Sequence, residues 1–308
     1  MIDLNCDLGE LPEAIADGTQ EALLRSITSA NVACGGHAGD AQTMRTTIEQ
    51  ALRAGVAIGA HPGYPDRANF GRLEMKNELQ MPLEALADSI CEQVRALAKI
   101  AAAFGTRLAH VKPHGALYNQ AVKDRALAEA IASGVAKALT AKVGRVGVVA
   151  ETGKAGEAGK VERAGEAMAS QPPLPPNTEH GSSSTEHGTR STEHEDVVLV
   201  GLAGSPMLDV FRHAGFPVAA EAFADRRYEP DGTLRSRKFD DALIRDPAEA
   251  SRQALSIAER GIVTAHGGTE VQLVAQTICI HGDTPGAPQI AAAVARSLRD
   301  AGVVLRAL

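Results

Sequence analysis

The chain has 308 residues, of which 44% are hydrophobic, 22% are charged and 3% are aromatic, with no tryptophan. Its formal net charge is −7 and it has no dense run of lysine and arginine, which argues against a nucleic-acid or anionic-membrane partner, because both require a positive surface. It shows no apolar run long enough to span a bilayer, no signal peptide and no CxxC pair among its four cysteines, so we expect a cytoplasmic protein with reduced thiols.

Short apolar runs alternate with amphipathic helical patterns along the chain, which is typical of repeated βα units. In chain order, strands are expected at residues 2–5, 29–33, 56–60, 108–111, 146–150, 197–202, 217–220 and 277–280. Helices are expected at residues 40–54, 82–104, 124–139, 247–260 and 288–301. Strand count alone leaves open a closed (β/α) barrel and a doubly wound sheet, and in both the C-terminal ends of the strands hold the active site.

Residues 153–195 have a different composition. They are rich in Gly, Ser and Pro and end in a repeat with a period of seven that carries His180, His187 and His194. Such sequence buries too little apolar surface to offset the entropy of ordering. We therefore expect one domain over residues 1–308 with a disordered low-complexity insert at about 153–195, and we expect these three histidines to bind no metal.

Four other histidines each follow an expected strand inside a glycine-rich turn: His37, His61, His114 and His281. Carboxylates stand at matching places, in the turns at residues 5–10 and 221–228. One such histidine would most often be structural. Several at matching strand ends predict a shared active site, because the sheet holds these loops in a fixed relation.

Two chemistries suit this set of residues. Asp7, His37 and His61 form the best trio for one divalent cation with an open position for water or a substrate oxygen. Alternatively, the same residues act as general acids and bases without a metal. Lys112 and Arg226 add positive charge suited to a carboxylate or a phosphate. The sequence has no GxxxxGK[ST] loop and no strand–GxGxxG–helix, so a nucleotide would bind in another way or on another subunit.

Taken in order, these motifs resemble the LamB/YcsF family. The resemblance rests on residues 3–10 (DLNCDLGE), 29–40, 58–72, 110–119 (HVKPHGALYN), 202–205, 221–228 (EAFADRRY) and 280–283 (IHGD). It implies a seven-stranded (β/α) barrel of the glycoside hydrolase/deacetylase type. It also implies opening of 5-oxo-L-proline to L-glutamate coupled to hydrolysis of ATP, performed together with the B and C subunits of a 5-oxoprolinase.

The resemblance also suggests roles for individual residues. A metal held by Asp7, His37 and His61, either Mg²⁺ or Zn²⁺, would polarise the lactam carbonyl or orient the water. The expected substrate-binding residues are Lys112, Asn119 and Arg226. The expected residues for proton transfer are His114, Glu221, Asp225, His281 and Asp283. ATP would phosphorylate the carbonyl oxygen, which gives water a better electrophile than an unstrained amide.

The sequence departs from the family pattern at Gly36, where the family commonly has Phe, and this predicts a more flexible and less packed loop before His37. Two alternatives stay open beside the 5-oxoprolinase interpretation. One is a stand-alone metal-dependent amide or lactam hydrolase, or a deacetylase, that needs neither ATP nor partners. The other is a binding protein that presents substrate to catalytic partners.

Overall fold

A computed structural model describes residues 1–74, 81–140 and 196–308, all of which belong to one compact unit. The strand expected at 146–150 and the insert expected at 153–195 lie outside these residues, so the domain organisation proposed from the sequence stays a prediction. Among the described helices, none has the length and apolar character that a membrane span requires.

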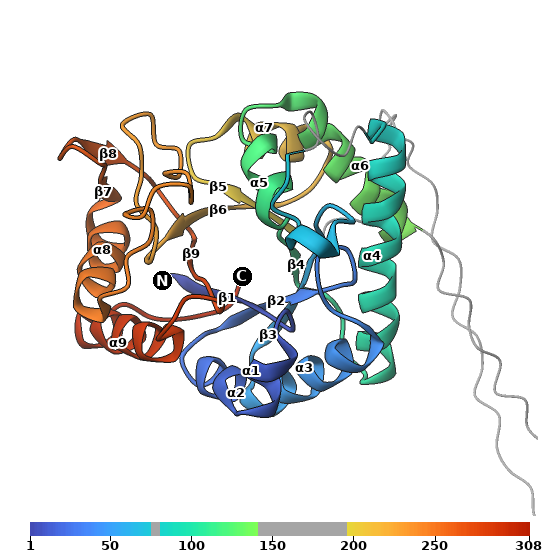
Figure 1. Ribbon diagram of the computed structural model, residues 1–308, viewed down its shortest axis with the longest axis horizontal. Coiled ribbons are helices and arrows are strands. Elements are labelled where there is room, and N and C mark those ends of the chain that lie inside the picture. The colour runs from blue at the N-terminus through green and yellow to red at the C-terminus, as the bar shows by residue number, and fades with distance from the viewer. Residues whose placement is uncertain (75–80, 141–195) are drawn as a thin grey trace, which may run out of the picture. The chain divides into compact units, whose positions relative to one another are not determined.

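Within the described ranges, seven parallel strands form a closed barrel, in which the last strand pairs back to the first (Figure 1). In their order around the barrel, the strands are β1 (Asp3–Leu8), β2 (Ser29–Ala33), β3 (Ala57–His61), β4 (His110–Val111), β5 (Val198–Leu202), β6 (Val218–Phe223) and β9 (Thr277–Ile280). The expected seven-stranded (β/α) barrel is confirmed, and closure of the sheet excludes the doubly wound alternative.

Helices surround this barrel in the view of Figure 1. They are α1 (Pro12–Ala16), α2 (Thr19–Leu24), α3 (Ala41–Ala54), α4 (Leu83–Ala103), α5 (Gly115–Ala121), α6 (Arg125–Thr140), α7 (Pro206–His213), α8 (Pro247–Arg260) and α9 (Ala287–Asp300), with a 3₁₀ turn, η1 (Arg67–Asn69). The five expected helices correspond to α3, α4, α6, α8 and α9. The short helices α1, α2, α5 and α7 have no counterpart among the expected elements, because helical periodicity needs several turns to become visible.

Helix α3 shows why these local sequences form helices. The Asp40 carboxylate accepts hydrogen bonds from the backbone N–H groups of Gln42 (2.9 Å) and Thr43 (2.8 Å), which satisfies two of the unpaired donors at the helix start. Gly55 ends the helix in the left-handed conformation, with φ 68°, which costs little without a Cβ. These two signals mark the start and the end of the helix that connects β2 to β3.

The sequence patterns did not indicate one further element, an antiparallel hairpin outside the barrel. It consists of β7 (Ile262–Thr264) and β8 (Glu270–Gln272). Each strand has only three residues, which is too short for an apolar alternation that a sequence pattern can detect.

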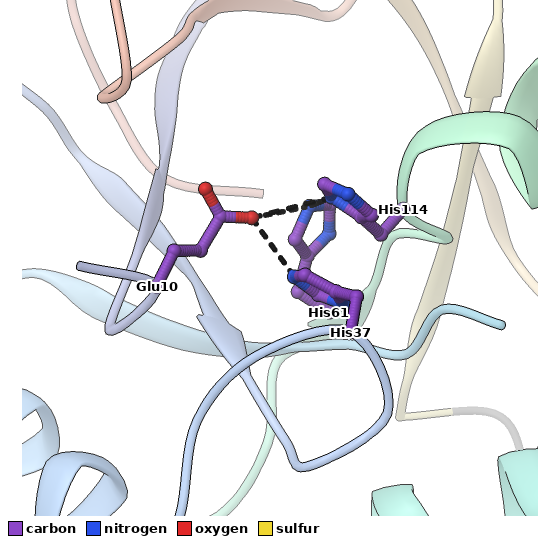
Figure 2. Close-up of side chains that lie close together, drawn as sticks. All are labelled: Glu10, His37, His61 and His114. Carbon is purple, nitrogen blue, oxygen red and sulfur yellow. Dashed lines mark hydrogen bonds and ion pairs between the residues drawn. The ribbon is translucent and has the colours of Figure 1, made fainter. Parts of the chain in front are cut away.

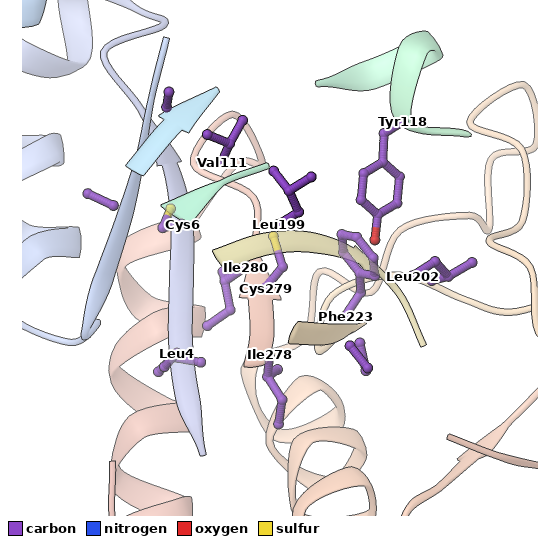
Figure 3. Close-up of a cluster of buried hydrophobic side chains, with 14 of the residues drawn as sticks. Leu4, Cys6, Val111, Tyr118, Leu199, Leu202, Phe223, Ile278, Cys279 and Ile280 are labelled. Atoms are coloured by element: carbon purple, nitrogen blue, oxygen red, sulfur yellow. The ribbon is translucent and has the colours of Figure 1, made fainter. Parts of the chain in front are cut away.

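The barrel interior is polar, and this follows from side-chain alternation along β1. Leu4, Cys6 and Leu8 belong to the hydrophobic core, where Leu4 and Cys6 lie with apolar side chains of β9 (Figure 3). Asp3, Asn5 and Asp7 alternate with them and bond to polar side chains of other strands. Asn5, for example, donates to Thr277 at 2.6 Å and to Glu221 at 3.0 Å. A buried polar column therefore runs up to the C-terminal ends of the strands.

One glycine of β3 is required by this column. Gly59 pairs with His110, whose ring Nε2 lies 2.7 Å from Asn31 Oδ1, and a Cβ at residue 59 would lie 2.1 Å from that ring nitrogen. We expect Gly59→Ala to lower the free energy of unfolding by about 1–3 kcal/mol through overpacking. Urea unfolding measures this. A loss smaller than about 0.5 kcal/mol, the range of ordinary surface substitutions, would contradict the steric explanation.

Candidate active site

The C-terminal ends of the barrel strands open onto one cavity of about 520 Å³. Most of the site residues expected from the sequence line it: Asp7, His61, Lys112, His114, Asn119, Arg226, His281 and Asp283. The other three lie directly behind lining residues, since His37 stacks on His114, Glu221 bonds to Lys112 and Asp225 bonds to His281. The expectation of a single site at the strand ends agrees with this arrangement.

Four side chains converge at one side of the cavity: Glu10, His37, His61 and His114 (Figure 2). They come from the ends of four consecutive strands, β1 to β4. Glu10 Oε1 lies 2.9 Å from His37 Nε2, 3.2 Å from His114 Nδ1 and 3.8 Å from His61 Nε2. One ligand atom from each residue lies within 4.8 Å of all the others, which is compatible with a single metal ion bound between them.

Backbone carbonyls orient two of these imidazoles. His61 Nδ1 lies 2.7 Å from the Lys112 carbonyl oxygen, and His114 Nε2 lies 2.9 Å from that of Phe70. Because a carbonyl oxygen only accepts, both of these ring nitrogens carry hydrogen. In the neutral rings, His61 Nε2 and His114 Nδ1 are then lone-pair atoms that face each other at 3.0 Å, beside the Glu10 carboxylate. Such a cluster of acceptors requires a cation, and carbonyls that fix the tautomer are typical of metal-binding histidines.

The charges around the cluster also favour a bound cation. Burial and the neighbouring His114 lower the pKa of His37 to about 4, so its ring is neutral at neutral pH. Burial alone would raise the pKa of Glu10, but the neighbouring His114 and His37 hold it well below its usual range. Burial would likewise lower the pKa of His61, yet the negative charges of Asp7 and Glu10 raise it. The cluster therefore attracts positive charge, which a bound metal ion would supply in place of a proton.

Glycines let the loops approach the cluster closely. A Cβ at Gly71, which has φ 63°, would lie 2.7 Å from the His37 Cβ, and one at Gly63 would lie 2.8 Å from His37 Nδ1. His37 and His114 stack with ring centroids 3.6 Å apart. Gly63, two residues after His61, and Gly71, directly after Phe70, are therefore required because a side chain at either position would clash with His37.

The expectation of a loosely packed loop at Gly36 is wrong. Gly36 is buried, and a Cβ there would lie 2.3 Å from Gln93 Oε1 and 2.8 Å from the Gly63 carbonyl oxygen. Gln93, on α4, donates to the Gly63 carbonyl (2.9 Å) and accepts from its N–H (3.0 Å). A glutamine from a distant helix fills the space that a larger residue 36 would need, and no local sequence signal reveals this.

Lys112 lies under the cavity with all of its hydrogens engaged. Its Nζ lies 3.0 Å from Asp7 Oδ1, 3.1 Å from Glu221 Oε1 and 2.9 Å from Cys279 Sγ, and the residue is 2% exposed. Burial would lower the pKa of Lys112, but the charge of Asp7, followed by Cys279 and Glu221, raises it well above its usual value. The ammonium group therefore stays charged and holds the two carboxylates together.

Asp7 stands between this group and the four-residue cluster. Its Oδ2 lies 3.3 Å from His61 Nε2, while its Oδ1 accepts from Lys112 and from Asn31. Asp7 also forms a second candidate metal group with Cys279 and His281. The ammonium of Lys112, bonded to both Asp7 and Cys279, already supplies a cation there. Among the described residues, the Glu10 cluster is therefore the better candidate for a metal.

On the opposite side, Asp225 and His281 form a carboxylate–imidazole pair. His281 Nδ1 lies 3.0 Å from Asp225 Oδ1, and the His281 backbone N–H donates to Asp225 Oδ2 at 2.9 Å. Burial would raise the pKa of Asp225, but the charge and hydrogen bonds of His281 lower it. An ionised carboxylate that holds Nδ1–H leaves Nε2 as the basic nitrogen, which is the arrangement of a general base.

The sequence interpretation missed two kinds of residue. Glu10 belongs to the recognised carboxylate turn, but Asp7 stood in its place in the expected metal trio. Arg72 and Arg237 bind Asp283 at the cavity mouth, and neither was expected in the site. Arg72 lies in a motif that supported the resemblance, whereas Arg237 lies in an irregular loop without any signal.

Comparison with known proteins agrees with these motifs. The model of the LamB/YcsF family matches residues 2–171 and 186–308. A protein of Chloroflexus aggregans, named as the A subunit of 5-oxoprolinase, is 42% identical over 305 residues, which covers 99% of this chain and 98% of the relative. A protein of the same name from Methylococcus capsulatus is 40% identical over 307 residues, covering 100% and 95% of the two chains.

A solved structure is also similar over its whole length. The Lactam Utilization Protein from Thermus thermophilus is 34% identical in sequence, and its structure matches this one with a TM-score of 0.75. The match covers 100% of this chain and 99% of that chain.

Proposed function

This chain belongs to the LamB/YcsF family, and from that premise we propose that it opens the lactam ring of 5-oxo-L-proline to give L-glutamate. We propose further that it does so as the A subunit of an ATP-dependent 5-oxoprolinase. The names of the relatives, Lactam Utilization Protein in one case and 5-oxoprolinase in the others, support the substrate class. The observation that carries the proposal is the cluster of Glu10, His37, His61 and His114, which faces one cavity with the Asp225–His281 pair.

The donor set of that cluster fits a divalent metal ion. We propose Glu10, His37, His61 and His114 as its ligands, with Asp7 as an outer partner of His61 in place of the direct ligand expected from the sequence. Three imidazoles favour Zn²⁺ or a similar transition metal over Mg²⁺, which prefers oxygen ligands. When bound, such an ion would polarise the lactam carbonyl or lower the pKa of a water molecule.

The other residues of the cavity then have separable tasks. His281, oriented by Asp225, would take the proton of the attacking water and return a proton to the ring nitrogen as the C–N bond breaks. Asn119 and Arg226 line the same cavity and would bind the substrate. Lys112 and Glu221 would hold the floor of the site in place without touching the lactam.

The dependence on ATP and on partners follows from the chemistry of the bond. A five-membered lactam is an unstrained amide, so phosphorylating its carbonyl oxygen makes the carbon more open to water. The sequence has no phosphate loop, so we propose that B and C subunits participate in supplying the activated substrate. The relatives are named as one lettered component of an enzyme, which supports a multisubunit assembly.

Reconstitution tests the proposal. The chain, alone and with its B and C partners, is incubated with 5-oxo-L-proline and ATP, and glutamate and phosphate are measured. We expect both products only in the complete mixture, and neither without ATP. If the complete mixture forms no glutamate, the proposed activity is wrong. If the metal-loaded chain alone opens the lactam without ATP, the stand-alone hydrolase is the correct interpretation; the metal cluster is what favours that alternative.

A further inference from the structure

A buried arginine at the side of the cavity forms no ion pair with a carboxylate of the described residues. Arg226 is 3% exposed, and its Nη2 donates to the Arg235 carbonyl oxygen at 2.7 Å. Its buried Nε has no hydrogen-bond partner among the described residues. The neighbouring Asp225 turns both carboxylate oxygens toward His281. Burying a charged guanidinium with an unpaired N–H lowers the stability of the protein, and an anionic ligand in the cavity would supply the missing acceptor and counter-charge.

A second guanidinium lies close to the first. Burial and the charge of Arg237 together lower the pKa of Arg226 to about 10. Arg237 Nη1 lies 3.2 Å from Asp283 Oδ2, and Arg72 binds that same oxygen. Asp283 is thus shared between two arginines that both line the cavity.

The remaining buried or paired cations of the cavity have their own carboxylates. These pairs are Lys112 with Asp7 and Glu221, Arg235 with Glu229 and Asp241, and Lys123 with Asp231. What is left at one end of the cavity is the three guanidinium groups of Arg72, Arg226 and Arg237 against the carboxylates of Asp283 and Asp225, and both Asp225 oxygens are already bonded to His281.

We propose that Arg226 and Arg237, with Arg72 beside them, form a subsite for a phosphoryl group, so that the phosphorylated lactam itself is held in this barrel. Three guanidinium groups offer more donors than the two oxygens of the lactam carboxylate can accept, whereas a phosphoryl group presents three terminal oxygens. Guanidinium groups bind phosphate oxygens through paired hydrogen bonds. The identity of the phosphorylated species rests on the proposed function; the anion subsite itself does not.

The proposed subsite would hold the phosphoryl group while the lactam ring is opened. The lactam carbonyl oxygen takes the terminal phosphoryl group of ATP, and ADP leaves. Water adds to the ring carbon, the C–N bond breaks, and the ring nitrogen takes both protons of that water to become the ammonium group, which leaves the phosphoryl group on the side-chain carboxyl of glutamate. A second water then releases phosphate and glutamate. Arg226 and Arg237 would hold the phosphoryl group from the arrival of the activated lactam until phosphate is released.

Binding of inorganic phosphate to the full chain tests the subsite without turnover. The protein is first treated with a chelator so that no metal binds phosphate, and affinity is measured by calorimetry. We expect Arg226→Gln and Arg237→Gln each to weaken phosphate binding at least about tenfold. Arg227→Gln is the matched control, because Arg227 is adjacent in sequence but pairs with Glu249 outside this cavity. Unchanged affinity in both test variants would overturn the proposal.

A variant that is expected to bind phosphate more tightly gives a result that misfolding could not produce. Asp283→Asn removes the carboxylate that competes for Arg72 and Arg237, so phosphate should bind several-fold more tightly, whereas Asp209→Asn on the exposed face of α7 should change nothing. Phosphate should also bind in the presence of saturating 5-oxo-L-proline. Displacement of phosphate by 5-oxo-L-proline would show that the subsite holds the substrate carboxylate, and would overturn the proposal. Failure of the glutamate assay alone would leave these binding results intact.

Discussion

Glu10→Gln is expected to remove bound metal from the protein and to lower the rate of lactam opening at least about 100-fold. The expectation follows because even partners of metal ligands commonly matter about 10- to 100-fold, and Glu10 is the one anionic donor of the cluster. The amide of glutamine keeps the size of the side chain but brings N–H groups toward nitrogens that need a cation. Metal content after dialysis and glutamate formation in the complete mixture measure the two effects separately.

Two controls sharpen this result. Glu13→Gln on the exposed side of α1 makes the same chemical change away from the cavity and should retain metal and activity. Asp7→Asn separates the metal trio expected from the sequence from the cluster seen in the structure. Metal retained in Asp7→Asn but lost in Glu10→Gln supports Glu10 as a ligand. The reverse outcome would restore Asp7 to the metal site and reject the cluster as drawn in Figure 2.

The contrast between Asp7 and Glu10 shows what a strand-end motif can and cannot specify. The motif at residues 3–10 predicted that carboxylates would reach the site, and they do. Which carboxylate meets the histidines depends on where the chain leaves the strand. Asp7 lies within β1 and is bound by Lys112, while Gly9, with φ 72°, turns the chain so that Glu10 reaches His37 and His114. That turn is a property of the folded backbone.

The barrel was predictable for a related reason. The strands are short and apolar on one face, and all but β6 are followed by a turn that contains glycine, so their positions and functional ends are visible locally. Residues brought in by irregular loops are not. Arg237 reaches Asp283 from the segment after β6, where isolated pairs such as Tyr228 with Leu234 shape the loop. Because an irregular loop has no periodic sequence pattern, the grouping of Arg237 with Arg72 and Arg226 could not be predicted from the sequence.

Lys112→Met is expected to lower the free energy of unfolding by about 3–5 kcal/mol at pH 7, the largest stability effect predicted for this chain. The substitution keeps much of the side-chain volume but removes the ammonium that lies 3.0 Å from Asp7 Oδ1 and 3.1 Å from Glu221 Oε1. Both carboxylates are then buried without their cation. Urea unfolding measures the loss, and Lys123→Met, which breaks an exposed pair with Asp231, should cost less than about 1 kcal/mol.

The pH dependence of this loss tests its electrostatic origin. Burial alone would raise the pKa of Asp7, but the charges of His61 and Lys112 hold it well below its usual range. A carboxyl with a depressed folded pKa stabilises the protein above its unfolded pKa, about 3.9, and loses that contribution as the pH falls through the folded value. Without Lys112 the pKa of Asp7 must rise, so Asp7 takes up a proton earlier and the deficit of Lys112→Met should shrink as the pH falls below about 4. Lys112→Met/Asp7→Asn should likewise recover part of the stability at pH 7. A deficit that stays constant with pH and is unchanged in the double variant would mean that Lys112 acts through packing, and that the polar column is not held together by charge.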